Sequence, residues 1–220
     1  TTTAPLHTRP ELAFQEHNTQ KLVKQTLLAA GVPEEHIKPC AGTGLVVDIV
    51  GRGPEVDVAL HCVAIRADMD CLPMPEANPD LPYRSKREGL AHACGHDGHV
   101  SVSTAFALMM HGVADKLPSN QRVRFLFQPA EEDTGGAEPM IAEGCLEGVD
   151  EVYGFHNINM LPLGCVWVQP GAASAHCCDF HITIKGAGGH GSSPHLAKDP
   201  VIACAAAAVA INTIVSRSVS

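Results

Sequence analysis

Cys94 and His96 stand two residues apart in the chain, and a thiolate and an imidazole are ligands that zinc and related divalent ions take in proteins. Gly95, between them, permits the backbone turn that would bring both side chains to one ion. Each residue also has an ordinary structural explanation, because a cysteine is often a small buried apolar group and a histidine is often a core residue with satisfied hydrogen bonds. Taken singly, the two explanations are about equally good.

Glu131 and Glu132 are adjacent carboxylates that could do two different jobs, because neighbouring side chains point in different directions. One can bind a metal ion while the other accepts and donates protons. An acidic pair is more often a solvated surface feature, but this pair directly follows residues 123–127 (VRFLF), a run too apolar for the surface. His156 stands in a similar place after the apolar segment 151–155, where a lone histidine is more often a core or capping residue than a ligand. The combination is more specific than its parts.

The elements expected around these residues alternate between strands and helices. Strands are predicted at residues 44–50, 56–66, 122–127 and 151–155, with the Gly- and Pro-rich residues 51–54 separating the first two as neighbours. Helices are predicted at residues 11–30, in the stretch that follows residues 91–99 and runs to about residue 110, and at 137–143. In open α/β sheets, ligands gather beyond the carboxyl ends of the strands. The sequence therefore predicts an α/β fold, with an open mixed sheet and helices on both faces.

The character of the chain changes after Pro170 and Gly171. Residues 179–185 alternate between apolar and polar types as a half-exposed strand does, and residues 199–215 form an Ala-rich helical stretch. We therefore expect residues 1–176 to be the first part of a metal-binding catalytic domain and residues 177–220 to begin a smaller, incomplete α+β domain.

Composition excludes several classes of protein. The formal net charge of -9 argues against nucleic acid as a partner. The longest apolar stretch, residues 201–211, stops at Asn212, short of the ~18 residues that a membrane helix needs. Nine cysteines are an odd number without the spacing of a disulfide scaffold, so we expect a reducing compartment and the cytoplasm. Cys71, Cys177 and Cys178 fit no ligand pattern.

Five motifs occur in the order seen in the M20 metallopeptidase family. They are residues 66–70 (RADMD) followed by 72–73 (LP), 94–99 (CGHDGH), 128–132 (QPAEE), 154–156 (GFH), and 188–191 (GGHG) followed by 194–195 (PH). The opening residues 7–14 (HTRPELAF) also look like the start of that family. The sequence most resembles the branch of N-acyl-amino-acid amidohydrolases, such as aminoacylases, hippurate hydrolases and plant hormone-conjugate hydrolases. The resemblance covers essentially the whole chain.

The resemblance implies a zinc-exopeptidase-like fold and the hydrolysis of N-acyl-L-amino acids or related small amides. It implies that Cys94, His96, Glu132 and His156 bind two divalent metal ions, with Cys94 bridging them. Glu131 would be the general base that takes a proton from the attacking water. A thiolate favours zinc, whereas the carboxylates also suit manganese, cobalt or nickel.

The resemblance also implies roles for residues around the ligands. Asp70 would orient a ligand without touching the metal. His190, in a Gly-rich segment of the second domain, would steady the tetrahedral oxyanion from a partner subunit, whereas its ordinary explanation is a histidine in a surface loop. The lid domain that residues 177–220 begin would then form a homodimer. His99 is expected to pack beneath the site on a helix face, and neither it nor His195 is expected to bind metal.

In the family that the sequence resembles, the catalytic sheet resumes after the lid and contributes a final histidine ligand, which we expect after Ser220. The chain is thus expected to be the first part of a larger protein, and this part alone is expected to have an incomplete metal site. One alternative is a non-catalytic relative that acts as a binding or regulatory module. A structural zinc protein fits poorly, because such sites close with four Cys or His ligands and make no use of an acidic pair.

Overall fold

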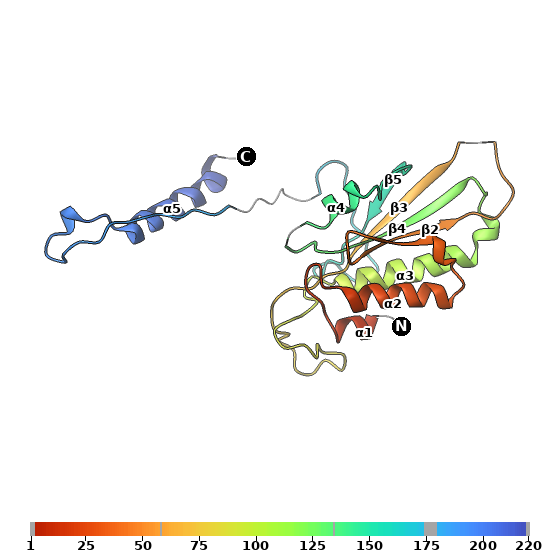
Figure 1. The fold of residues 1–220 in the computed structure, drawn as a ribbon, viewed down its shortest axis with the longest axis horizontal. Coiled ribbons are helices and arrows are strands. Elements are labelled where there is room, and N and C mark those ends of the chain that lie inside the picture. Colours follow the sequence, from red (N-terminus) through yellow and green to blue (C-terminus); the bar gives the residue numbers. More distant parts are fainter. Residues whose placement is uncertain (1–2, 58, 134, 174–179, 219–220) are drawn as a thin grey trace. The chain divides into compact units, whose positions relative to one another are not determined.

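The computed structural model describes residues 3–57, 59–133, 135–173 and 180–218 (Figure 1). The chain divides into two compact units, residues 1–163 and 164–220. The predicted domain boundary, between residues 176 and 177, lies outside the described residues. All seven cysteines that the structure describes are free thiols, and Cys177 and Cys178 also lie outside the described residues.

The first unit contains a five-stranded mixed sheet in the order β1-β2-β4-β3-β5. The strands are β1 (Ile37–Cys40), β2 (Gly44–Val50), β3 (His61–Asp68), β4 (Gln121–Gln128) and β5 (Glu151–Gly154). Strand β3 runs parallel to both β4 and β5, whereas β2 is antiparallel to both β1 and β4. The expectation of an open mixed sheet is confirmed, but the expectation that β2 and β3 are neighbours is wrong, because β4 lies between them.

Helices cover both faces of this sheet (Figure 1). Helices α1 (Thr3–His7), α2 (His17–Ala29) and α3 (His96–Gly112) lie on one face, and the short α4 (Ala137–Ala142) lies on the other. Short 3₁₀ turns at Glu34–His36 and Ala114–Lys116 connect the elements.

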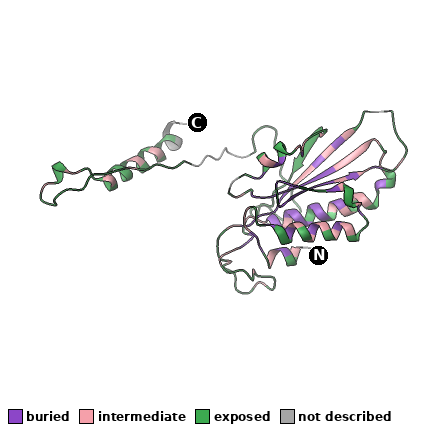
Figure 2. Cartoon of the chain, viewed as in Figure 1, coloured by how far each residue is buried: buried purple, intermediate pink, exposed green. Residues whose placement is uncertain are grey.

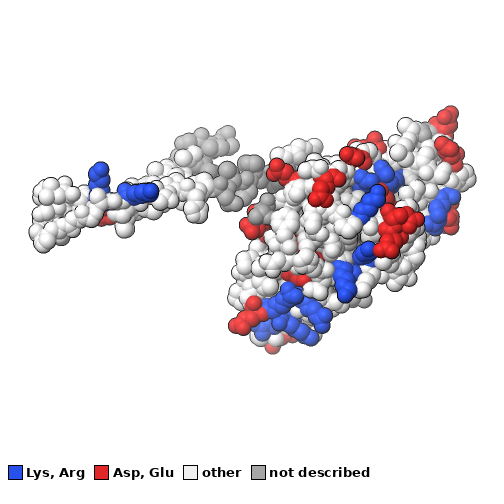
Figure 3. Space-filling view, in the orientation of Figure 1, with Lys and Arg blue, Asp and Glu red and all other residues white. Residues whose placement is uncertain are grey.

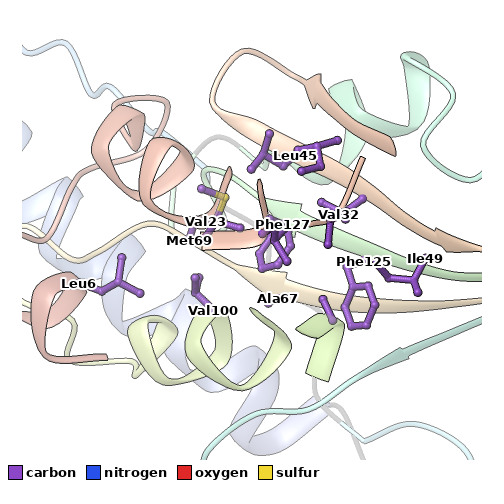
Figure 4. Close-up of a cluster of buried hydrophobic side chains, with 14 of the residues drawn as sticks. Leu6, Val23, Val32, Leu45, Ile49, Ala67, Met69, Val100, Phe125 and Phe127 are labelled. Carbon is purple, nitrogen blue, oxygen red and sulfur yellow. The ribbon is translucent and has the colours of Figure 1, made fainter. Parts of the chain in front are cut away.

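Two hydrophobic cores hold these layers together, because successive side chains of a strand point to opposite faces. Phe125 and Phe127 of β4 are fully buried in the larger core, which packs against α2 and α3 (Figure 4). Leu126, between them, belongs to the smaller core, with Met140 of α4. Buried residues concentrate in the sheet and in α2 and α3 (Figure 2). The sheet is therefore fixed between two packed faces, and its strand ends are held in register.

Two expected element boundaries are wrong for identifiable reasons. The expected helix at residues 11–30 begins only at His17, because the buried Glu11 carboxylate accepts the backbone N–H groups of Asn18 and Thr19, capping α2 from outside the helix. The strand expected at residues 56–66 is β3, which begins at His61 and pairs there with Gln121, the first residue of β4.

In the second unit, the described residues form a 3₁₀ turn at Pro194–Leu196 and helix α5 (Pro200–Ser218). The strand expected at residues 179–185 is absent from residues 180–185, and residue 179 lies outside the described residues. The nearest pairing is an isolated bridge between Ala187 and Lys198, and no neighbouring strand pairs with residues 180–185 among the described residues. In the described part of the chain, no helix is long and apolar enough to span a membrane.

Candidate metal centre

The carboxyl ends of the three parallel strands meet at one edge of the sheet. The register places Asp68, at the end of β3, opposite Gln128 at the end of β4, and places Gly154, at the end of β5, opposite Arg66. Residues that directly follow these three strands are therefore brought close together, although they lie far apart in the sequence. These residues are Asp70, Glu131, Glu132 and His156.

The start of α3 lies beside the same edge. Gly95, the N-cap residue of this helix, has φ +86°, a left-handed conformation that glycine adopts without the strain imposed on other residues. The turn places the Cys94 Sγ 3.3 Å from His156 Nε2. An open hollow of about 420 Å³ lies beside this pair and is lined by residues 93–95 and 156–159.

His96, almost completely buried, lies at the centre of the site. Its Nδ1 donates a hydrogen bond to the main-chain carbonyl of Asp70 at 2.9 Å, which leaves Nε2 as the atom facing the other groups. That Nε2 lies 3.6 Å from Glu132 Oε1 and 3.9 Å from Glu131 Oε2. Ligand atoms of Cys94, His96 and His156 form one group able to hold a metal, and those of His96, Glu131 and Glu132 form another. The five residues predicted for the metal and the base thus come together.

The buried atoms of this cluster fit a divalent cation. His96 Nε2 and Glu132 Oε1 are both inaccessible to solvent and have no hydrogen-bond partner among the described residues. Such unpaired buried groups are costly. Two ligand atoms about 2.0–2.2 Å from one zinc ion at a tetrahedral angle are about 3.4 Å apart, close to the separation found here. A cation between them would satisfy both atoms.

The charges of the site also favour a cation. Asp68, Asp70, Glu131 and Glu132 all lie within 3.9 Å of a His96 ring nitrogen. Burial, followed by the carboxylates of Glu132, Glu131 and Asp68, raises the pKa of the Cys94 thiol to about 12. A thiol that binds a metal ion does so as a thiolate, which adds one more negative charge to these carboxylates. A divalent cation would offset this excess of negative charge.

Burial alone would lower the pKa of His96, but its hydrogen bond to Asp70 and the charges of Asp68, Asp70 and Glu132 outweigh it and raise the pKa. Asp70 also holds the acidic pair, because its Oδ2 accepts the backbone N–H of Glu132 at 2.9 Å. One buried carboxylate thus contacts both His96 and the Glu131–Glu132 turn. This geometry supports the predicted orienting role of Asp70.

A third close group, from Asp68, His96 and His99, is less suited to a metal. The His99 Nδ1 donates to Asp68 Oδ1 at 2.6 Å, and its Nε2 accepts the backbone N–H of Asn157 at 3.0 Å. The second oxygen of Asp68 is paired with Arg66 at 2.6 Å. With both ring nitrogens engaged, the fully buried His99 supports the site from beneath it.

Sequence reasoning did not identify Glu16 as part of this site. Its fully buried carboxylate accepts the backbone N–H of Ala130 at 2.8 Å and the Thr43 hydroxyl at 2.5 Å. Ala130 has φ +51°, a conformation that non-glycine residues rarely adopt, and it directly precedes Glu131. Glu16 therefore holds the strained turn that presents the acidic pair. No local sequence pattern indicates this contact, because Glu16 and Ala130 are 114 positions apart.

His190 lies in the second unit, in an exposed glycine-rich segment. Its Nδ1 lies 2.8 Å from the Ser192 hydroxyl and also accepts the Ser192 backbone N–H at 3.2 Å. Residues 186–191 line a hollow of about 540 Å³ together with residues 194 and 197–200. The predicted action of His190 on an oxyanion, from a partner subunit, stays a prediction.

The charge distribution of the first unit is mixed. On the face shown in Figure 3, Lys and Arg side chains lie among Asp and Glu side chains rather than forming a surface of one sign. The four carboxylates around His96 are, in contrast, a local concentration of negative charge.

Comparison with known proteins places this geometry in a family. The chain is 42% identical over 218 residues to thermostable carboxypeptidase 1 of Saccharolobus solfataricus and 39% identical over 218 residues to N-acetyl-L-cysteine deacetylase of Bacillus subtilis. These alignments cover 97% and 98% of this chain but 53% and 49% of the relatives, so the chain spans about half their length.

A solved structure agrees. The Bacillus subtilis YXEP protein, described as a dinuclear metal binding peptidase from the M20 family, is 37% identical with a TM-score of 0.66, over 74% of this chain and 43% of that one. The model of peptidase family M20/M25/M40 matches residues 64–219, which include every residue predicted for the metal and the base. The chain therefore belongs to peptidase family M20/M25/M40, a family of hydrolases.

Proposed function

We propose that the full-length protein hydrolyses the amide bond of N-acyl-L-amino acids and related small amides, with Glu131 as the general base. The observation that carries the proposal is the placement of Glu131 beside buried ligand atoms suited to divalent cations, namely His96 Nε2 and Glu132 Oε1. The names of the two relatives support the substrate class, because a peptide C-terminus and an N-acetyl amino acid share one chemical unit. In both, the amine half of the amide is an amino acid with a free carboxylate.

Four side chains are proposed to hold two divalent ions: Cys94, His96, Glu132 and His156. When bound, such ions polarise the amide carbonyl and lower the pKa of a bound water. The mixture of a thiolate, imidazoles and a carboxylate favours zinc among the candidates. We infer that a further ligand and the pocket for the acyl group come from the part of the protein beyond this chain.

The two glutamates differ in exposure, and this difference separates their proposed roles. The Glu132 side chain is 20% exposed and directs Oε1 into the buried site, whereas the Glu131 side chain is 40% exposed. A proton acceptor must reach both the attacking water and the departing amine, so the more accessible Glu131 suits that role. Its carboxylate takes the proton of the water and then delivers it to the amine nitrogen of the leaving amino acid.

The substitution Glu131→Gln in the full-length protein tests this proposal, because it keeps the size of the side chain and removes the proton acceptor. We expect turnover of N-acetyl amino acids to fall by about 10²–10⁴-fold, with metal content unchanged. Glu138→Gln, an exposed substitution on α4, is the matched control and should retain full turnover. Equal turnover by Glu131→Gln and wild type would refute the role of Glu131. A wild-type protein that binds metal without any hydrolysis would instead indicate a binding module.

A further inference from the structure

Asn157 directly follows the proposed ligand His156 and contacts three separate parts of the metal centre. We propose that Asn157 is a positioning residue that fixes the placement of Cys94 and His156 relative to each other; the inference rests on the proposed metal-dependent function. The three contacts use different groups of this one residue, namely its carbonyl oxygen, its side-chain amide and its backbone N–H.

The first contact sets the ring of His156. The His156 Nδ1 donates a hydrogen bond to the Asn157 carbonyl oxygen at 2.8 Å. A histidine whose Nδ1 carries the proton presents Nε2 as its free lone pair, and the partner of the other nitrogen sets the orientation of a metal-binding imidazole. Here that Nε2 lies 3.3 Å from the Cys94 Sγ, so the hydrogen bond to the Asn157 carbonyl oxygen holds the ring with Nε2 toward the thiol.

The second contact joins the Asn157 side chain to the segment that carries Cys94 and His96. The side-chain Nδ2 donates to the carbonyl oxygen of Gly95 at 3.3 Å. A Cβ atom at Gly95 would lie 2.0 Å from that Nδ2, and one at Gly98 would lie 3.5 Å from it. The amide therefore lies against the first turn of α3, in space that Gly95 leaves open. This hydrogen bond joins two segments that are 62 residues apart in the sequence.

The third contact ties the same residue to β3. The backbone N–H of Asn157 donates to His99 Nε2 at 3.0 Å, and His99 Nδ1 donates to Asp68 at 2.6 Å. The ring of His99 also packs edge-on against that of His156, with centroids 4.7 Å apart. The end of β5 is thus held from two sides, by the buried His99 and by the Gly95 carbonyl.

Only the link to Gly95 depends on the side chain of residue 157, so substitution there separates positioning from chain folding. In Asn157→Ala the amide is lost, while both backbone contacts can persist. Removing a group that orients a metal ligand typically costs about 10–100-fold in metal affinity, and we expect a loss of about 10-fold for the weaker of the two ions. Asn157→Leu keeps the number and branching of the side-chain heavy atoms but has no hydrogen-bond donor, and it should show the same loss.

The test is titration of the metal-free full-length protein with Co²⁺, with the near-ultraviolet thiolate-to-cobalt charge-transfer band as the readout for Cys94. We expect both Asn157→Ala and Asn157→Leu to need about tenfold more Co²⁺ to develop the band. Gln25→Ala is the matched control, because its exposed side-chain amide on α2 lies outside the metal centre and has no hydrogen bond to a described residue, and it should titrate as wild type does.

The outcomes separate this inference from the proposed function. If wild type develops the band and both Asn157 variants titrate identically to it, the positioning role is refuted, whatever the turnover. If only the melting temperature of the metal-free protein falls and the affinity of the folded protein for Co²⁺ is unchanged, Asn157 has only a structural role and the inference is equally refuted. A normal wild-type titration without hydrolysis of any N-acyl amino acid would contradict the proposed function and leave the assignment of Asn157 standing on its own data.

Discussion

Replacing Glu16 by alanine should destabilise the fold and loosen the turn at Ala130 that presents the Glu131–Glu132 pair. The buried backbone N–H of Ala130 would lose its acceptor, which costs about 1–3 kcal/mol, and the hydrogen bond between Thr43 and a carboxylate, worth about 1.5–3 kcal/mol, would also be lost. Removing a buried carboxylate recovers part of this cost. We therefore expect the free energy of unfolding to fall by about 3 kcal/mol.

Catalysis should fall as well. Ala130 is held at φ +51°, a conformation that costs on the order of 1–3 kcal/mol, and it can relax once Glu16 no longer binds its N–H. A shift of about 1 Å in Glu131, the next residue, would lower turnover by about 10²-fold. Metal content should fall less than turnover, because Asp70 still accepts the backbone N–H of Glu132.

The assay combines urea unfolding, which gives the free energy of unfolding, with turnover of an N-acetyl amino acid by the full-length protein. Glu16→Gln should lose only about 1 kcal/mol, because its amide oxygen can still accept the Ala130 N–H. Glu35→Ala, at an exposed position, is the control and should match wild type within about 0.5 kcal/mol. If Glu16→Ala also lies within about 0.5 kcal/mol of wild type with full turnover, the reasoning about this turn is wrong.

Two further predictions concern the N-terminus of α3. Gly95→Ala should lower the melting temperature and the metal affinity, because φ at residue 95 is +86° and the new Cβ would lie 2.0 Å from the Asn157 amide nitrogen. Adding Asn157→Ala should remove the part of the stability loss that comes from this clash and leave the part that comes from the positive φ. A double-mutant cycle would measure the difference. Burial alone would lower the pKa of His7, but hydrogen bonds to Glu76 and Asp97 and their charges raise it above 6.5. Its contribution to stability is therefore complete below about pH 6.5 and is lost as pH rises through the raised pKa, so the unfolding free energies of wild type and His7→Ala should converge toward alkaline pH.

Local patterns predicted the strands best where a run rich in β-branched or aromatic residues is followed closely by glycine or proline. Residues 44–50 form β2 as predicted, and the strand predicted at 122–127 extends by one residue at each end. The helix start at His17 was missed because its cap, Glu11, comes from outside the helix. The order of the strands was also missed, because it depends on pairing between segments far apart in the chain, which no local pattern specifies.

The residues that could bind metal were predictable, because each motif places a characteristic ligand type directly after an apolar strand or at the start of a helix. The groups that hold them in place were predicted only in part, because Asp70 and His99 were expected near the site but Glu16 was not. Glu16 contacts Ala130 across 114 positions and His99 contacts Asp68 across 31, and neither pairing has a signature in composition or periodicity. Asn157 was also missed, because its role depends on the space at Gly95, which only the folded backbone reveals.

The central claim is that a thiol, two imidazoles and a glutamate converge to hold divalent ions beside Glu131. Calorimetric titration of Zn²⁺ into the metal-free full-length protein tests it most directly. The expected result is two equivalents per protein chain for wild type and a clear loss of binding in His96→Ala, whose ring nitrogen lies at the centre of the site. Wild-type protein that takes up no zinc, or His96→Ala protein that takes up as much as wild type, would contradict the claim.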